Sequence, residues 1–150
     1  MKRRANLGWA IALLLTSMGC TQAQPNHPPR TLQIEQTWQL QPGHSIAGHR
    51  IVSGLGDISV QVKGNRVYAP FDGTVEPHAT DCVFFSSSQV PAYLIRLCGI
   101  QRSRFGDVRE GEAIGNSTLL QVAVLRRQPS GQWALVEPST SILERTLRKP

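Results

Sequence analysis

Short runs of hydrophobic and β-branched residues recur along the chain between glycine, proline, asparagine and aspartate. Each run has about the length of one strand, and no helical-period segment long enough for a crossover lies between them. This spacing is typical of a mostly antiparallel sandwich or barrel rather than a parallel sheet. We expect strands at residues 32–40, 46–52, 58–62, 67–69, 74–75, 82–85, 92–98, 113–114, 119–125 and 133–136.

The end of the chain has a different pattern. After Pro138, residues 139–148 carry apolar side chains at helical spacing, and Ser141 is followed three positions later by Glu144. A serine and a glutamate at this spacing form a capping box. The pattern therefore predicts an all-β, mostly antiparallel fold with a short C-terminal helix.

Two stretches rich in turn residues stand out between the runs. Residues 67–75 place Pro70 and the Asp72–Gly73 pair between two β-prone segments, which predicts a hairpin. Residues 107–115 repeat this arrangement, with glycines at positions that favour positive φ.

The N-terminus has the pattern of an export signal. Lys2, Arg3 and Arg4 precede an apolar stretch at residues 7–15 that is too short to span a bilayer. We therefore expect a signal peptide at residues 1–19, a proline-rich tether at residues 20–30 and a single β-rich domain at residues 31–150.

Two processing routes remain open. Ser17-Met18-Gly19-Cys20 resembles a bacterial lipobox, which predicts a lipid anchor on Cys20 and attachment to a membrane of the cell envelope. Alternatively, cleavage after Ala23 would discard Cys20 and release a soluble protein to the periplasm or beyond.

Composition limits the remaining classes. A chain of 150 residues with 40% hydrophobic and 17% charged residues can form one compact domain, and it has no apolar run that would suit a membrane channel. Removal of residues 1–19 takes away three cations and no acid, which lowers the net charge from +6 to +3. We therefore do not expect nucleic acid as a partner.

Two cysteines remain in the expected domain, in β-prone segments on either side of the turn-rich residues 86–91. An even number of cysteines in an oxidising compartment favours a disulfide over a metal site. A hairpin would bring Cys82 and Cys98 together, and we expect them to be bonded.

The motifs, taken in order, resemble a lysostaphin-type (LytM) zinc endopeptidase domain. The resemblance covers roughly residues 46–147: Gly-Asp-Ile at 56–58, Val-Tyr-Ala-Pro-x-Asp-Gly-Thr-Val at 67–75, Gly-Asp-Val-Arg-x-Gly-Glu-Ala-Ile-Gly at 106–115, and Glu-Pro at 137–138. It implies a barrel-sandwich hybrid fold. In active relatives it also implies a zinc site that cuts peptide cross-links of bacterial cell walls.

The metal ligands of that family are mostly replaced in this chain. The resemblance assigns one ligand to Asp57 and a histidine to the position of Ser53, four residues earlier; a His-x-His motif aligns best with Leu119 to Gln121. One carboxylate cannot hold a catalytic zinc, which needs about three protein ligands. We therefore expect no cofactor and a chain that is not an enzyme.

Three functions stay open. The first is a non-catalytic envelope lipoprotein that binds peptidoglycan or regulates a wall hydrolase; the resemblance places possible groove residues at Tyr68, Phe71, Tyr93, Arg96 and Gln121. The second is an active zinc endopeptidase with a rearranged site, for which His44, His49, His78 and Asp57 are candidates. The third is an assembly module that docks onto another envelope protein through Trp38 or Trp133.

Overall fold

The structure, a computed structural model, describes residues 38–150. The expected signal peptide, Cys20, Ala23 and the tether lie outside the described residues. The elements in chain order are β1 (Ser45–Ile46), β2 (His49–Ser53), β3 (Ile58–Gln61), β4 (Arg66–Tyr68), β5 (Gly73–Ala79), β6 (Cys82–Ser86), β7 (Tyr93–Gln101), β8 (Gly106–Val108), β9 (Ala113–Arg127), β10 (Trp133–Val136) and α1 (Thr140–Leu147).

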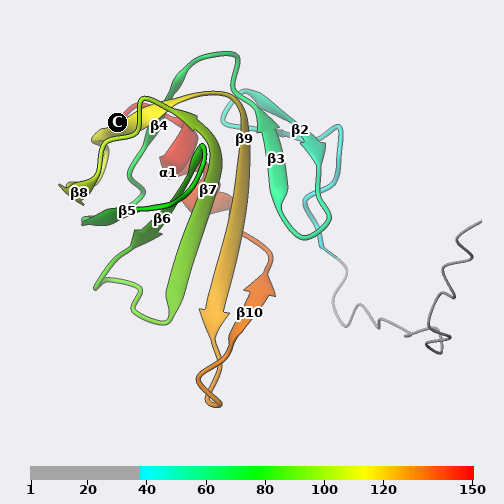
Figure 1. The fold of residues 1–150 in the computed structure, drawn as a ribbon. Helices are drawn as coiled ribbons and strands as arrows, with labels where there is room; N and C mark the ends of the chain where they lie inside the picture. Colours follow the sequence, from blue (N-terminus) through cyan, green and yellow to red (C-terminus); the bar gives the residue numbers. More distant parts are fainter. Residues whose placement is uncertain (1–37) are drawn as a thin grey trace, which may run out of the picture. The chain divides into compact units, whose positions relative to one another are not determined.

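The strands form one open sheet in the order β1-β2-β3-β9-β7-β6-β5-β8, and β4 and β10 also pair with β9. Each strand pairing in residues 38–150 is antiparallel. The 15-residue strand β9 is the centre of this arrangement, because it pairs with four other strands (Figure 1). The predicted fold class, all-β and mostly antiparallel with a short C-terminal helix, is confirmed.

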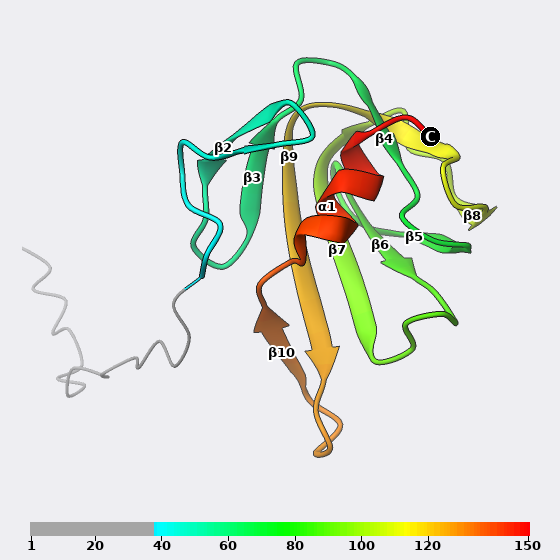
Figure 2. The same ribbon diagram turned by 180° about the vertical axis from the view of Figure 1, so that it is seen from behind.

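The helix covers one face of the sheet, and the core lies beneath it. Figure 2 shows α1 in front of β7 and β9, whereas Figure 1 shows these strands from the opposite side without a covering helix. Leu143 and Leu147 of α1 are buried and join a cluster that includes Phe85, Ile95 and Val122. Phe85 and Ile95 are register partners, and Val122 lies two positions before Val124, the partner of Ile95, so these buried side chains share the covered face. In residues 38–150, no helix has both the length and the apolar character to cross a membrane.

The helix start differs from the predicted capping box. Ser139, not Ser141, is the N-cap, and its hydroxyl accepts a hydrogen bond from the backbone N–H of Ile142 at 3.3 Å. The residue three positions after the cap is therefore Ile142 rather than a glutamate, so no capping box forms. Ser141 lies inside the first turn, where it contributes no cap to the backbone.

The two predicted hairpins are wrong, because the two motifs pair with each other. Ala69 donates its N–H to the carbonyl of Glu112 at 2.9 Å and accepts from the N–H of Gly111 at 2.8 Å. The side chain of Asp72 accepts from the N–H of Glu110 at 2.8 Å. Strand β4 consequently pairs with β9, and β5 pairs with β6 and β8. Gly111 has a positive φ of 78°, as its motif predicts, whereas Gly115, the other glycine of that motif, does not.

Several strand limits also differ from the expectation. The segment 46–52 is interrupted by a tight turn at Ala47 and Gly48, both with positive φ, which separates β1 from β2. Residues 113–125 form the single long strand β9 rather than two strands, because the polar residues between the two predicted runs stay paired with neighbouring strands. Residues 38–40 are not in a strand.

The predicted hairpin around the cysteines is confirmed. Strands β6 and β7 pair in antiparallel register, and Cys82 and Cys98 are direct partners whose Cα atoms lie 4.0 Å apart. The structure contains the Cys82–Cys98 disulfide. Both sulfurs belong to strand positions that face away from α1.

Candidate functional site

The uncovered face of the sheet carries most of the polar side chains that the sequence singled out. Residues that are register partners point to the same side of a sheet, so the pairing defines this surface. We call it the open face. Its central members are Ser53, Asp57, Ser59, His78, Cys82, Phe84, Arg96, Cys98, Gln121 and Ala123.

Asp57 and Arg96 form the charged centre of the open face. The guanidinium Nη2 of Arg96 lies 3.9 Å from Oδ2 of Asp57, and the Ser59 hydroxyl donates to Oδ1 of Asp57 at 3.3 Å. Ala123 of β9 is the register partner of Arg96, and β9 separates β7 from β3. A methyl group there leaves room for the arginine to reach across the strand.

This ion pair orients its members more than it stabilises the fold. The side chains of Arg96 and Asp57 are 39% and 23% exposed. Pairs exposed to this degree contribute between zero and about 1 kcal/mol, because water screens the charges. The guanidinium therefore remains accessible to an anionic ligand, with its position set by the carboxylate.

The positions that the resemblance assigns to metal ligands also lie on the open face. Ser53 is the register partner of Ser59, and Ser59 is in turn the partner of Gln121. Leu119 lies two positions before Gln121 on the same side of β9 and is 43% exposed. Ser53 and Gln121 thus lie on either side of Ser59, which also hydrogen-bonds Asp57, and of these residues only the aspartate is a metal-ligand type.

An aromatic pair lies next to this centre. Phe84 of β6 is the register partner of Arg96, and the His78 ring of β5 stacks on Phe84 with 4.2 Å between ring centroids. The disulfide borders the same region, because Cys98 is the partner of Gln121. The open face therefore combines a charged pair, an amide and an aromatic surface.

The other expected groove residues lie away from this centre, although Tyr93 also lines the shallow cavity at the end of the open face. Phe71 packs beneath the guanidinium of Arg145 in α1, with 5.2 Å between the charge and the ring centroid. Tyr93 and Phe71 both line a cavity that reaches the start of α1. Tyr68 lies on β4, half-buried, and pairs with Ala113. Of the five expected groove residues, only Arg96 and Gln121 are brought together on the open face.

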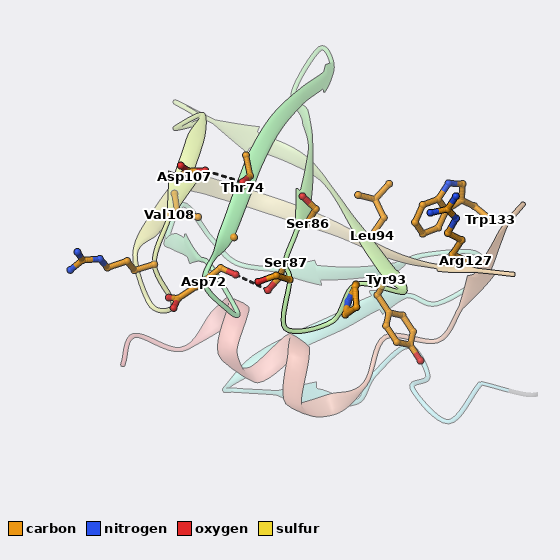
Figure 3. A pocket seen from close by; sticks show the side chains of 14 residues that line it. Asp72, Thr74, Ser86, Ser87, Tyr93, Leu94, Asp107, Val108, Arg127 and Trp133 are labelled. Atoms are coloured by element: carbon orange, nitrogen blue, oxygen red, sulfur yellow. Dashed lines mark hydrogen bonds between the residues drawn. The ribbon is translucent and has the colours of Figure 1, made fainter. Parts of the chain in front are cut away.

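A shallow cavity of about 700 Å³ opens at one end of the same face (Figure 3). Thr74, Ser86 and Leu94 are successive register partners across β5, β6 and β7, and their side chains form its floor. The Thr74 hydroxyl donates to Oδ1 of Asp107 at 2.9 Å. Trp133 closes the far side of the cavity, where Figure 3 shows its indole next to a neighbouring arginine. This cavity and its aromatic wall were not found from sequence, because they depend on strand order.

The histidines are spread across the sheet. His49 lies on β2 and His78 on β5, and four strands separate β2 from β5 in the sheet order. His44 is exposed in the loop before β1. Within residues 38–150, no three His, Cys, Asp or Glu side chains are grouped so that they could hold a metal ion.

Two comparisons with known proteins found no match. No protein-family model matches the chain, and no curated protein sequence matches it.

Proposed function

We propose that this protein is a non-catalytic member of the lysostaphin-type scaffold that binds peptidoglycan, or regulates a cell-wall hydrolase, through its open face. The observation that carries the proposal is the grouping of Ser53, Asp57 and Gln121 on that face. The resemblance assigns these positions to the metal site of active relatives. The rest of the proposal follows from the chemistry of the residues now present there.

The open face suits a peptide or glycan strand that carries carboxylates. Arg96 offers a partly exposed guanidinium, which recognises carboxylates through charge-assisted hydrogen bonds. The Gln121 amide can both donate to and accept from a peptide group. Phe84 and His78 supply an aromatic surface for a sugar ring or an aliphatic side chain. None of these contacts requires a metal ion.

Hydrolysis is not favoured by this donor set. Water activation by zinc needs about three protein ligands and one open position. The Asp57 carboxylate already accepts from Ser59 and pairs with Arg96, and Ser53 and Gln121 have no imidazole. We therefore propose that the chain is not an enzyme and works without a cofactor.

We further propose that the protein is an exported lipoprotein of the bacterial envelope. The Cys82–Cys98 disulfide supports an oxidising compartment, because such bonds are rare in reducing ones. Lipidation of Cys20 would then attach the chain to a membrane. Mass spectrometry of the mature N-terminus distinguishes this route from cleavage after Ala23.

Sedimentation with purified peptidoglycan tests the binding proposal. We expect the protein to be retained at low salt, and we expect Arg96→Gln and Gln121→Ala each to weaken retention by about tenfold, the usual loss for a charged or central contact. Arg104→Gln is a matched control, because Arg104 also forms an exposed ion pair, 3.6 Å from Glu112, on another surface. Absent retention, or equal retention of all variants, would contradict peptidoglycan binding at this face.

The rearranged zinc peptidase is tested on the same sample. It requires stoichiometric zinc in the purified protein and digestion of cell wall that stops when a chelator is added. Finding both would replace the non-catalytic proposal.

One observation favours docking onto a partner protein as a second candidate. Trp133 and Leu135 of β10 are 44% and 45% exposed, and their positions alternate so that both side chains leave the same face. Trp38 packs against the core instead and is half-buried. A photo-crosslinking residue at position 133 should capture one envelope protein in cells if docking occurs there, and no discrete product if it does not.

A further inference from the structure

A second polar cavity, of about 400 Å³, lies at the corner of the sheet where β1, β2 and β3 meet. Its lining contains two obligate cations, one histidine and neutral hydrogen-bonding groups. No carboxylate is among the lining residues. They are Ser45, Gly48, His49, Arg50, Gln61, Lys63 and Asn65.

The sheet register brings part of this lining together, whereas His49 is paired with the buried Ile46 and therefore lies on the opposite side of β2 from Arg50. Arg50 is paired with Ser45 on one side and with Gln61 on the other, so the three side chains share one face. Lys63 follows β3 in a tight turn and has a positive φ of 59°. This turn ends the strand and places the lysine at the rim of the cavity.

His49 has a defined role in this lining. Its Nδ1 lies 3.3 Å from the backbone carbonyl of Gln61. A carbonyl only accepts, so Nδ1 carries the proton and Nε2 is the ring nitrogen left for a ligand.

The two obligate cations are not neutralised within the fold. Neither Arg50 nor Lys63 takes part in any of the three ion pairs found among residues 38–150. A carboxylate has two oxygens and one charge, which a single arginine can satisfy. A phosphate group presents more oxygens and up to two charges, which matches an arginine, a lysine and the neutral donors Ser45 and Asn65.

We propose that this cavity binds a phosphate group through Arg50 and Lys63. The phosphate belongs either to the headgroup of an anionic phospholipid or to a small soluble phosphate. The site uses none of the central residues of the open face, and it does not depend on peptidoglycan binding.

The soluble source is tested by nuclear magnetic resonance on the full chain. Inorganic phosphate, added at constant ionic strength against chloride, should shift the His49 imidazole and Lys63 amide signals. Concentrations up to about 20 mM cover the millimolar Kd expected from a few exposed ionic contacts. Arg50→Gln and Lys63→Gln should each weaken binding by about fivefold. Arg66→Gln removes a nearby exposed cation that does not line the cavity, and it should leave binding unchanged.

The lipid source is tested by co-sedimentation of the same variants with vesicles. One set contains phosphatidylcholine alone, and the other contains equal parts of phosphatidylcholine and phosphatidylglycerol. Residues 1–37 are the same in all variants, so any contribution from them cancels in the comparison. Binding should fall as salt rises, because the contacts are exposed.

The combined outcomes distinguish a lipid headgroup from a soluble phosphate, and they show when the proposal is wrong. Phosphate shifts together with phosphatidylglycerol-dependent binding, both lost in the Arg50→Gln, Lys63→Gln double variant, identify a headgroup site. Phosphate shifts without vesicle binding identify a site for a soluble phosphate. The proposal is overturned if phosphate moves none of these signals, or if Arg66→Gln weakens binding as much as Arg50→Gln, since that would indicate diffuse charge.

Discussion

Removal of the Cys82–Cys98 disulfide is expected to lower the free energy of unfolding by about 3 kcal/mol at 25 °C. The bond joins register partners of the β6–β7 hairpin that are 16 positions apart in the chain. In the chain-entropy model, closing a loop of this length removes roughly 3 kcal/mol of unfolded-state freedom. The other register pairs of the hairpin remain without the bond, so the effect should fall mainly on the unfolded chain.

Urea unfolding of the Cys82→Ala, Cys98→Ala double variant measures this loss. We expect a lower midpoint and a steeper dependence on urea, because an uncrosslinked unfolded chain exposes more surface. A loss of about 3 kcal/mol corresponds to a fall in Tm of roughly 10–20 °C for a domain of this size. Wild-type protein treated with a reductant should match the double variant, which separates the bond from the side-chain change.

Kinetics give the sharper test of the reasoning. If the bond acts on the unfolded state, its removal slows folding and leaves the unfolding rate almost unchanged. A stability loss below about 1 kcal/mol would contradict the magnitude. A loss that appears mainly as faster unfolding would show instead that the hairpin is still open in the transition state or that the bond stabilises the folded hairpin.

Three further predictions follow from the fold. Gly99→Ala should lower the free energy of unfolding by about 3 kcal/mol, because Gly99 has a φ of 77° and a Cβ there would collide with a backbone carbonyl of β9. Gly64→Ala should lower it by only about 1 kcal/mol, because Gly64 has a φ of 85° but lies in open space. Thermal unfolding of both variants measures this difference. Ser139→Ala should remove about 1 kcal/mol with the N-cap, whereas Ser141→Ala should change the unfolding free energy by a few tenths, and comparison of their urea midpoints checks this order. Arg96→Gln should change stability by less than about 1 kcal/mol, so circular dichroism should find it as folded as the wild type when its wall binding is measured.

Local sequence patterns predicted the strands whose side chains alternate between core and solvent. β6 and β7 were predicted from runs rich in apolar and β-branched residues. Within these runs the buried register pairs Val83–Leu97 and Phe85–Ile95 face the core. The same patterns failed at Ala47, because alanine carries no turn signal although it has a φ of 48° there. They also failed at residues 116–118, whose polar side chains interrupt the apolar pattern although β9 continues through them.

The open face could be anticipated only in part. The resemblance placed Asp57 and Gln121 together, and the structure does so as well. It did not indicate that Arg96 would pair with Asp57, since that contact depends on β9 lying between β3 and β7. Phe84, the stacking of His78 on it, and the cavities were missed for the same reason, because residues far apart in sequence become neighbours only once the strand order is known.

The two turn-rich motifs, residues 67–75 and 106–115, pair with each other. The resemblance therefore bears on the fold and on the function in different ways. Residues of its two turn-rich motifs contact each other, as Gly111 does Ala69 and Asp72 does Glu110, whereas Asp57, which also carries it, lies on the open face. Their pattern can therefore be explained by strand pairing alone, whatever chemistry the domain performs. Function has to be sought in the side chains that the pairing leaves free, which on the open face are centred on Arg96 and Gln121. Substitution of the motif residues should then reduce folding and binding together, whereas substitution of Arg96 or Gln121 should reduce binding alone.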